Sequence, residues 1–157
     1  MFLNDMNEIF KLKLDKLPKY FEQLLQSDFL TRNNLIGVPE KGVYVFYEDE
    51  NPIYVGRSNR VKFRLGEHGR LGSKSNDVNF AFKLAKEEAE KLKLDIKRIK
   101  AALVSDKEFA ICFTEAKRRV ASMTIKVVEI NDPADQTLFE IYAAVVLSTK
   151  YNSFETT

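Results

Sequence analysis

The sequence predicts an α/β (α+β) domain in which a three-stranded sheet is flanked by helices. Two short runs of β-branched and aromatic residues, 42–47 and 52–56, are separated by polar residues, as expected for a β-hairpin. Apolar and polar residues alternate over 123–130, which indicates a third strand. Residues 133–148 are apolar on most sides, so we expect a deeply packed helix there. These elements fit one compact layered domain.

The remaining helices are predicted from periodicity and from capping residues. Apolar residues at spacings of three and four over 2–30 indicate an amphipathic helix, broken near Leu17 because Pro18 disfavours helix in the residue before it. Asp132 and Pro133 are a helix N-cap and a proline at the first helical position, and they mark the start of the packed helix. Three further segments complete the prediction: a loop over 31–41, a helix over 58–67 that breaks at Gly69, and a charged helix over 79–100 that is mainly a solvated face.

Length and composition exclude several classes of protein. A chain of 157 residues with 45% hydrophobic residues can bury a core as one domain without disulfides or a structural metal. The single cysteine, Cys112, lies in an apolar stretch where a buried thiol is expected, and one cysteine with one histidine cannot form a zinc cluster. No apolar run approaches the roughly 20 residues that span a membrane, so we predict a cytoplasmic protein without a membrane partner.

The charge distribution is uneven along the chain. The formal net charge is only +2, which does not by itself indicate a nucleic-acid partner. Between Arg57 and Lys74, six lysines and arginines stand against one acid, Glu67, which gives a local net charge of +5. Contacts from these residues to phosphates would make binding strongly salt-dependent. A solvated helix face accounts for the same run equally well, and both interpretations stay open.

Two glycine–tyrosine strand ends stand at the predicted hairpin, GVY at residues 42–44 and YVG at residues 54–56. Arg64 lies eight residues after Gly56 and a histidine four residues later, while a glutamate lies in FEIYAA and an asparagine in TKYNSF. This combination resembles the signature of the GIY-YIG nucleases, a family that hydrolyses phosphodiester bonds in DNA. The resemblance covers about residues 40–157. It implies a small central antiparallel sheet flanked by helices, preceded here by an N-terminal helical extension.

Glu140 is the most unusual single residue of the chain. It lies in an apolar helical run, with no basic residue within nine positions on either side. A carboxylate buried there is unfavourable unless it is paired or holds a metal. The structural alternatives are a solvent-facing glutamate and a pair with a distant arginine. The resemblance implies that Glu140 ligates one divalent cation, Mg²⁺ (or Mn²⁺), together with water and substrate oxygens.

Arg64 and His68 are one helical turn apart, so both are expected on one helix face, which Arg60 extends by another turn. The resemblance implies that Arg64 clamps the scissile phosphate, for which a guanidinium offers bidentate donors at every working pH. It also implies a catalytic role for His68 in proton transfer, although a lone helical histidine is usually a surface residue. Arg57 and Arg60 are expected to contact substrate phosphates.

Tyr44 and Tyr54 sit at the ends of the two hairpin strands, where alternation can point both rings to one face. Aromatic core packing is the structural interpretation. The resemblance implies that one tyrosine is the general base for the attacking water and the other orients that water or contacts phosphate; we favour Tyr44 as the base. Asn152 follows the helix of Glu140, where the family has an asparagine that stabilises the site or binds the substrate.

We therefore expect a divalent-metal-dependent DNA endonuclease that leaves 5′-phosphate and 3′-hydroxyl ends. Residues 36–157 would form the nuclease domain. Residues 1–35 would form the helical extension, which either packs on the core or supplies a homodimer contact. Two alternatives remain: a non-catalytic DNA-binding or interaction module on the same fold, and a nuclease acting on RNA or branched DNA. The intact motif argues against the first, and the lack of a recognisable RNA-binding module argues against RNA.

Overall fold

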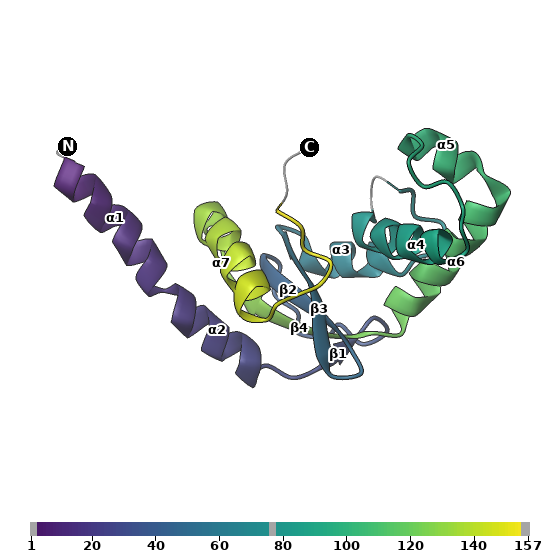
Figure 1. Ribbon diagram of the computed structural model, residues 1–157. Coiled ribbons are helices and arrows are strands. Elements are labelled where there is room, and N and C mark those ends of the chain that lie inside the picture. Colours follow the sequence, from purple (N-terminus) through teal and green to yellow (C-terminus); the bar gives the residue numbers. More distant parts are fainter. Residues whose placement is uncertain (1–2, 76–77, 155–157) are drawn as a thin grey trace. The chain divides into compact units, whose positions relative to one another are not determined.

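The computed structural model describes residues 3–75 and 78–154, so Phe2, the first residue of the predicted N-terminal helix, lies outside it. The chain falls into two compact units: unit 1 is Met1–Leu30, Asn34–Lys62 and Thr124–Thr157, and unit 2 is Thr31–Asn33 and Phe63–Met123. The elements in chain order (Figure 1) are α1 (Leu3–Asp15), α2 (Leu17–Gln26), β1 (Leu30–Thr31), β2 (Gly42–Glu48), β3 (Asn51–Ser58), α3 (Val61–His68), α4 (Asn79–Lys91), α5 (Lys100–Ser105), α6 (Lys107–Ala121), β4 (Thr124–Glu129) and α7 (Pro133–Val146).

The predicted hairpin is present as β2 and β3, which pair antiparallel with Tyr44 opposite Gly56. Asp49 and Glu50 form its two-residue turn, and both have positive φ, of 49° and 66°. Positive φ at both central residues is typical of a type I′ turn, whose twist matches that of the strands. The predicted third strand is β4, which pairs antiparallel with the other side of β2. The hairpin and the third strand are therefore confirmed.

The sheet has four strands rather than the predicted three, in the order β1-β4-β2-β3. The additional strand is β1, which lies where the predicted helical stretch over 2–30 meets the predicted loop over 31–41. A two-residue strand is too short to show an alternating pattern, so periodicity cannot identify it. Very short edge strands are also one way in which proteins blunt the edge of a sheet. The three-strand prediction is wrong in this element, and the mixed α/β class is confirmed.

The core of unit 1 lies between one face of the sheet and the helices α2 and α7 (Figure 1). Val45 and Val55 of the hairpin pack there with Leu24 of α2 and Phe139 of α7, and all four residues are fully buried. The ring of Tyr20 meets that of Phe139 edge-on, with the centroids 5.8 Å apart. The second N-terminal helix therefore packs on the core, which was one of the two roles expected for the extension.

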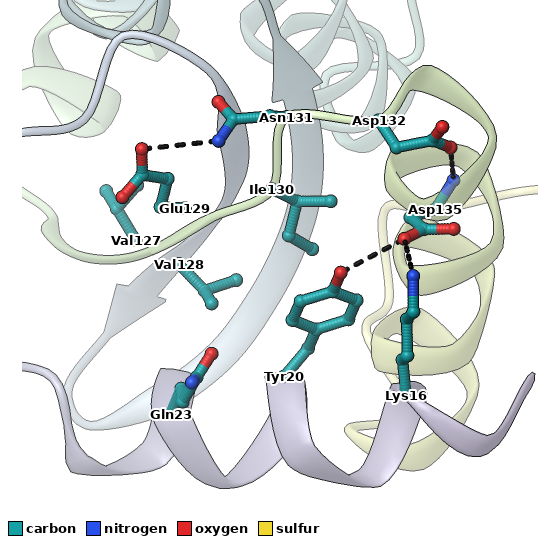
Figure 2. Close-up of a pocket in the computed structure, with 10 residues that line it drawn as sticks. All are labelled: Lys16, Tyr20, Gln23, Val127, Val128, Glu129, Ile130, Asn131, Asp132 and Asp135. Atoms are coloured by element: carbon teal, nitrogen blue, oxygen red, sulfur yellow. Dashed lines mark hydrogen bonds and ion pairs between the residues drawn. The ribbon is translucent and has the colours of Figure 1, made fainter. Parts of the chain in front are cut away.

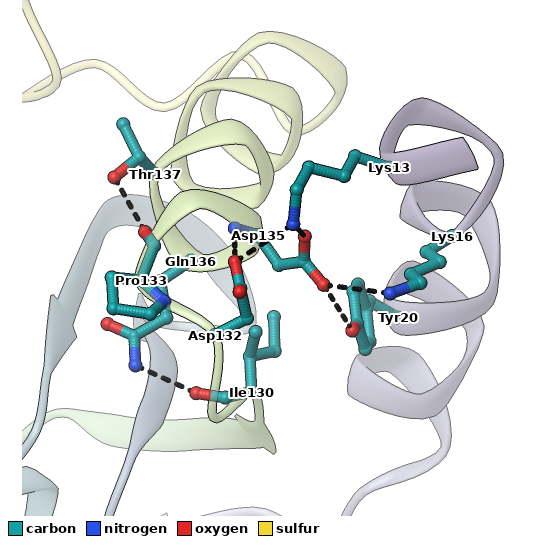
Figure 3. Close-up of polar contacts among 9 residues, drawn as sticks. All are labelled: Lys13, Lys16, Tyr20, Ile130, Asp132, Pro133, Asp135, Gln136 and Thr137. Carbon is teal, nitrogen blue, oxygen red and sulfur yellow. Dashed lines mark hydrogen bonds and ion pairs between the residues drawn. The ribbon is translucent and has the colours of Figure 1, made fainter. Parts of the chain in front are cut away.

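A polar cluster around Asp135 ties the N-terminal helices to the start of α7 (Figure 3). The Asp135 carboxylate is 1% exposed and accepts hydrogen bonds from the Lys13 ammonium at 2.9 Å and the Tyr20 hydroxyl at 3.0 Å. Lys16 lies at the helix break expected near Leu17 and donates at 3.3 Å. Burial by itself would raise the pKa of Asp135, but these donors outweigh it and hold the pKa below its usual value. The domain boundary expected at residue 35 stays a prediction.

Both ends of α7 have identifiable caps. The predicted N-cap is confirmed, because Asp132 Oδ1 accepts a hydrogen bond from the backbone N–H of Asp135 at 2.9 Å and a proline follows in the first turn. At the other end Ser148 has a φ of 52°, and the N–H of Thr149 donates to the carbonyl of Ala144 at 3.1 Å. A left-handed residue with this backbone bond is a Schellman-type end, which stops the helix near the predicted position.

Unit 2 is helical, and its core lies between α4 and α6. The ring of Phe82 on α4 lies 5.3 Å from that of Phe109 and 5.9 Å from that of Phe113 on α6, measured between centroids. The prediction of one charged, mainly solvated helix over 79–100 is therefore wrong in two respects. The helix ends at Lys91, and one face of it is buried. Its aromatic and small residues, and not its charges, decide which face turns inward.

The end of α4 and the start of α6 both depend on short backbone-directed contacts. Lys93 has a φ of 61°, its N–H bonds to the carbonyl of Glu90 at 2.9 Å, and the N–H of Leu94 bonds to that of Ala89 at 3.0 Å. This is again a Schellman-type end, but its left-handed residue is not the glycine from which such an end can be predicted. Asp106 caps α6 by accepting two backbone N–H groups of the first turn, at 2.9 and 3.0 Å. The helix α6 was not predicted, although Asp106 is a recognisable cap.

Two predictions from composition can be compared with the described residues. Cys112 is a buried free thiol, as predicted, and burial is the main cause that raises its pKa. A thiol with a raised pKa is a poor nucleophile at neutral pH, which agrees with a packing role. Within residues 3–75 and 78–154, no helix combines the length and the apolar character needed to cross a membrane.

Candidate functional site

Several predicted site residues of unit 1 gather at the outer edge of β3. This strand is an edge strand, because among the described strands it neighbours β2 alone. A Cβ atom added to Gly56 of β3 would lie 2.5 Å from both Cζ and the hydroxyl oxygen of Tyr44, its cross-strand partner. The Tyr44 ring therefore crosses from β2 over the backbone of Gly56, and its hydroxyl lies level with the edge strand. Glycine is needed here for close approach, not for an unusual backbone angle.

Arg57 and Glu140 meet at the same edge from the other face of the hairpin. Alternate strand residues face opposite sides, so Arg57 lies on the face that packs against α7. Its Nε is 2.7 Å from Oε2 of Glu140, whose side chain is 26% exposed. The alternative of a pair with a distant arginine is therefore observed. Burial raises the pKa of Glu140, and the charge and hydrogen bond of Arg57 partly oppose that effect.

Asn152 holds the edge strand beside this pair. Its side-chain oxygen accepts a hydrogen bond from the N–H of Val55 at 2.7 Å, and its side-chain nitrogen donates to the carbonyl of Val55 at 2.8 Å. The N–H of Tyr151 donates to the carbonyl of Ile53 at 3.1 Å, so the C-terminal segment occupies the open side of β3. The hydroxyl of Thr149 donates to Asn152 at 2.8 Å, a contact that no sequence pattern indicated. A substrate contact of Asn152 stays a prediction.

Tyr54 and Arg60 lie in unit 1 on either side of Gly56 in the sequence. The ring of Phe46 lies 5.8 Å from that of Tyr44 and 6.4 Å from that of Tyr54, so the two tyrosines share one face as expected. Tyr44 is buried and Tyr54 is half-buried. Arg60 is exposed just before α3, where its backbone N–H donates to Ser58 Oγ at 2.9 Å. The ring of Tyr44 is therefore part of the packed core, and only its hydroxyl could take part in a reaction.

Arg64 and His68 belong to unit 2 and have different environments on α3. Arg64 is half-exposed, with Nη1 3.4 Å from Oε2 of Glu67, and such surface pairs are weak. His68 is fully buried, and its ring centroid lies 6.4 Å from that of Phe80. Burial, with a smaller contribution from the charge of Arg64, lowers the pKa of His68 to about 3. The imidazole is therefore neutral at physiological pH, and its role in proton transfer stays a prediction.

The buried His68 makes the stability depend on pH. In the unfolded chain the imidazole binds a proton near its ordinary pKa of about 6.5, whereas in the folded chain it stays neutral down to about 3. Between these values the unfolded state binds one more proton, so the free energy of unfolding falls by up to about 1.4 kcal/mol per pH unit as the pH is lowered. Urea unfolding between about pH 7.5 and about pH 4.5 measures this slope, and His68→Gln should flatten it. An imidazole that titrates near its ordinary pKa by NMR would contradict the buried neutral state.

A polar cleft of about 650 Å³ lies elsewhere in unit 1, lined by α2 and β4 (Figure 2). Figure 2 shows Tyr20 and Gln23 of α2, and Lys16 just before this helix, facing residues 127–132. The cluster around Asp135 closes one end of it. None of the sequence-predicted site residues lines this cleft, so it is not part of the edge of β3.

Glu140 is the candidate metal ligand at the edge of β3. Among the residues that the structure describes, no group of three or more His, Cys, Asp and Glu side chains could hold a metal ion. One half-buried carboxylate does not fit a structural zinc site, but it fits Mg²⁺, which keeps most of its waters and binds one or two carboxylates with substrate oxygens. Arg57 contacts Glu140 through Oε2, which leaves Oε1 for a cation.

Comparison with known proteins identifies no relative of this chain. No protein-family model, no curated protein and no solved structure matches the chain. A function is therefore supported by two observations only, the sequence resemblance and the geometry at the edge of β3.

Proposed function

We propose that this protein is a divalent-metal-dependent DNA endonuclease that hydrolyses phosphodiester bonds and leaves 5′-phosphate and 3′-hydroxyl ends. The observation that supports it is that Tyr44, on one face of the edge strand β3, and the Arg57–Glu140 pair, on the other face, all reach the edge of this strand. These residues come from three separate elements and supply a hydroxyl, a cation and a carboxylate. Phosphodiester hydrolysis needs a base for the attacking water, positive charge on the phosphate and a ligand for the metal.

The hydroxyl of Tyr44 is the proposed general base. It lies against the backbone of Gly56, one residue before the guanidinium-bearing Arg57. A phenol is a weak base at neutral pH because its ordinary pKa is about 10, so the proposal requires the bound metal ion to favour the phenolate when substrate is present. In this mechanism the phenolate oxygen of Tyr44 removes a proton from the water that attacks phosphorus and keeps that proton as the hydroxyl.

Arg57 and Glu140 change partners when substrate binds in this proposal. Their ion pair is partly exposed, with side chains 43% and 26% accessible, so it is weak and exchangeable. Arg57 turns to the phosphate, for which its planar fork is suited, and Glu140 is released to hold Mg²⁺ or Mn²⁺. When bound, the cation neutralises charge on the phosphate and on the leaving oxygen.

The other predicted residues have supporting roles. Asn152 is a positioning residue, because it fixes β3 at the site. Tyr54 orients the attacking water and Arg60 contacts phosphate, following the resemblance. The phosphate clamp by Arg64 and the assistance by His68 rest on the resemblance alone. The cytoplasmic location and a homodimer contact through the N-terminal helices likewise stay predictions.

Replacing Tyr44 with phenylalanine tests the proposal, because it removes the hydroxyl and keeps the ring over Gly56. Tyr47→Phe is the matched control, since Tyr47 is buried on the same strand and belongs to the core on the other face. Wild-type and Tyr47→Phe proteins are expected to nick supercoiled plasmid in Mg²⁺ and to stop in EDTA. Tyr44→Phe is expected to nick about 10²-fold more slowly, the usual loss for a general base.

Each other outcome has a distinct meaning. Nicking by Tyr44→Phe at the wild-type rate would assign the base to another group. Product formed in EDTA would indicate a contaminant or a metal-independent reaction. No product from the wild-type protein, with duplex binding retained in a gel shift, would favour the non-catalytic module. Cleavage confined to RNA or branched DNA would correct the substrate.

A further inference from the structure

The side-chain amide of Gln136 links the first turn of α7 to the residue that follows β3. Gln136 is 2% exposed, and its Nε2 donates hydrogen bonds to the carbonyl oxygen of Ile130, at 2.8 Å, and to Oδ1 of Asn59, at 3.1 Å. Figure 3 shows the bond from Gln136 to Ile130. All three residues belong to unit 1, as does the edge of β3. A buried group therefore holds an exposed side chain at the end of this strand.

The carbonyl of Ile130 determines which way both amides face. A carbonyl oxygen only accepts hydrogen bonds, so the atom of Gln136 beside it is the nitrogen Nε2. The same nitrogen lies against Asn59, so the atom of Asn59 that faces it is the oxygen Oδ1. Ile130 is itself fixed, because its N–H donates to the carbonyl of Lys41 at 3.2 Å. The nitrogen Nδ2 of Asn59 is therefore the end of its amide that faces away from α7.

Asn59 consequently presents two N–H donors in one orientation. The residue is exposed, and among the residues that the structure describes no atom accepts a hydrogen bond from its Nδ2. An exposed amide without a partner on its oxygen would rotate, whereas the bond from Gln136 holds this one. A group that is already oriented loses less conformational freedom when a ligand binds. These donors suit a ligand whose atoms only accept hydrogen bonds.

The contact of Asn59 lies next to the ion pair of Arg57 and Glu140. Gln136 and Glu140 are four residues apart on α7, so they lie on one face of the helix, about 6 Å apart along its axis. Gln136 holds Asn59, and Glu140 pairs with Arg57. The same face of α7 therefore orients both side chains at the end of β3. Their donors are close enough to contact one stretch of a DNA backbone.

We propose that Asn59 is a further substrate-binding residue, whose side-chain N–H groups donate to a phosphate oxygen of the DNA, and that Gln136 is the positioning residue that keeps these donors facing outward. The choice of DNA rests on the proposed nuclease function. Asparagine side chains are among the groups that bind DNA phosphates, whose oxygens only accept hydrogen bonds. The paired contact of asparagine with adenine also needs the side-chain oxygen, and Gln136 already occupies that atom.

A structural link between α7 and the end of β3 is the competing interpretation. Such a link uses Oδ1 of Asn59 and does not need its nitrogen. Asn59→Asp separates the two roles, because aspartate keeps an oxygen for Gln136 and replaces the outward donors with a second oxygen. Asn59→Ala removes both ends of the amide. Because Asn59 is exposed, both variants should fold.

Binding is measured on the full chain in EDTA, so that cleavage does not interfere. Fluorescence anisotropy with two labelled duplexes of about 30 base pairs and unrelated sequence, between about 50 and about 300 mM salt, gives the affinity and its salt dependence. The matched controls are Asn51→Ala and Asn51→Asp, since Asn51 is an exposed asparagine at the opposite end of β3. Chemical denaturation compares the stability of each variant with that of the wild-type protein.

Asn59→Ala is expected to weaken binding to both duplexes about 10-fold, the effect of losing one hydrogen bond to a charged group. The slope of log K against log salt should stay that of the wild-type protein, because no cation is removed. Asn59→Asp should weaken binding further, since its charge repels phosphate, and should keep wild-type stability. Both Asn51 controls should bind nearly as tightly as the wild-type protein.

Three results would contradict the phosphate contact. Wild-type affinity in Asn59→Ala would show that the amide does not bind DNA. Losses of the same size in the Asn51 controls would show that the effect does not depend on position. A loss on only one of the two duplexes would show that Asn59 reads a base edge and not the backbone.

The role of Gln136 is tested by combining substitutions. Gln136→Met keeps the length of the side chain and removes the amide, and it should weaken binding by up to about 10-fold. In an Asn59→Ala background the same change should have no further effect, because the side chain that it positions is gone. An equal loss in both backgrounds would mean that Gln136 does not act through Asn59. If Gln136→Met does not fold, the Asn59 variants still test the phosphate contact.

Two further results separate this inference from the proposed function. Binding that depends on Asn59, in a protein that never nicks DNA, would leave the inference standing and remove the nuclease proposal. Nicking in Mg²⁺ by Asn59→Ala with the KM of the wild-type protein, together with wild-type affinity in EDTA, would leave the nuclease standing and overturn the inference. The expected result is a raised KM with kcat nearly unchanged, because a contact to bound substrate is lost.

Discussion

Glu140→Gln is expected to lower the rate of plasmid nicking about 10³-fold, the scale of losing a main electrostatic element of the site. Glutamine keeps the size of glutamate and can still accept a hydrogen bond from Arg57, so the edge of β3 keeps its shape. It lacks the negative charge that ligates a divalent cation. The free energy of unfolding should change by less than about 1 kcal/mol, because the pair with Arg57 is partly exposed and the unfavourable burial of the carboxylate is removed.

Glu129→Gln is the control for this variant, since Glu129 is an exposed glutamate at the end of β4. Calorimetric titration with Mn²⁺ should show binding to wild-type and Glu129→Gln proteins and a clear loss in Glu140→Gln. Burial raises the pKa of Glu140, and metal binding requires the deprotonated carboxylate. The Mn²⁺ affinity of the wild-type protein should therefore begin to fall at a pH above that of an ordinary glutamate. An unchanged Mn²⁺ affinity in Glu140→Gln would place the metal elsewhere.

Gly56→Ala is expected to lower the free energy of unfolding by about 2 kcal/mol, as overpacking of a full site does. The new methyl group would lie 2.5 Å from both Cζ and the hydroxyl oxygen of Tyr44, a residue that is itself only 1% exposed. The ring has to move, and the proposed base moves with it. A displacement of about 1 Å in a reacting group can lower a rate about 10²-fold, so nicking should fall as well.

Gly66→Ala is the matched control, because nothing lies within 4 Å of a Cβ atom at Gly66. This position is in α3, where alanine is the better helix former, so the control should stabilise the protein by about 0.5–1 kcal/mol. Chemical denaturation of both variants measures the difference. In a Tyr44→Ala background the same change at Gly56 should destabilise much less, since the ring it meets is gone. A Gly56→Ala protein with wild-type stability would show that the ring does not lie over Gly56.

Strands and helix ends that depend on nearby residues in the sequence were predictable from it. The β-branched and aromatic runs identified β2 and β3, the alternation over 123–130 identified β4, and the Asp132 cap identified the start of α7. Local pattern failed where a contact outside the element decides the outcome. The strand β1 is too short to show an alternating pattern. The helix α4 ends at Lys93 in a left-handed conformation, for which lysine is not a typical residue.

For the candidate site, the identities of the residues were predictable, whereas the contacts between them were not. The motif identified Tyr44, Arg57 and Glu140, and their order in the sequence says nothing about which of them touch. The pair between Arg57 and Glu140 joins residues from different elements, and the burial of His68 depends on the packing of α3 within unit 2. Periodicity places a side chain on a face of its helix, but it does not say what covers that face.

The interrupted path of the chain through unit 1 sets an order of folding. Residues 63–123 are contiguous in unit 2, whereas β2 pairs with β4 from the two sides of that segment. Contacts between near neighbours in the sequence form sooner than contacts that close long loops. Amide protection during refolding should therefore appear first in α4 and α6 and last in the pairing of β2 with β4. On the ribosome, the sheet of unit 1 waits for the synthesis of β4, while the residues of unit 2 have already been made.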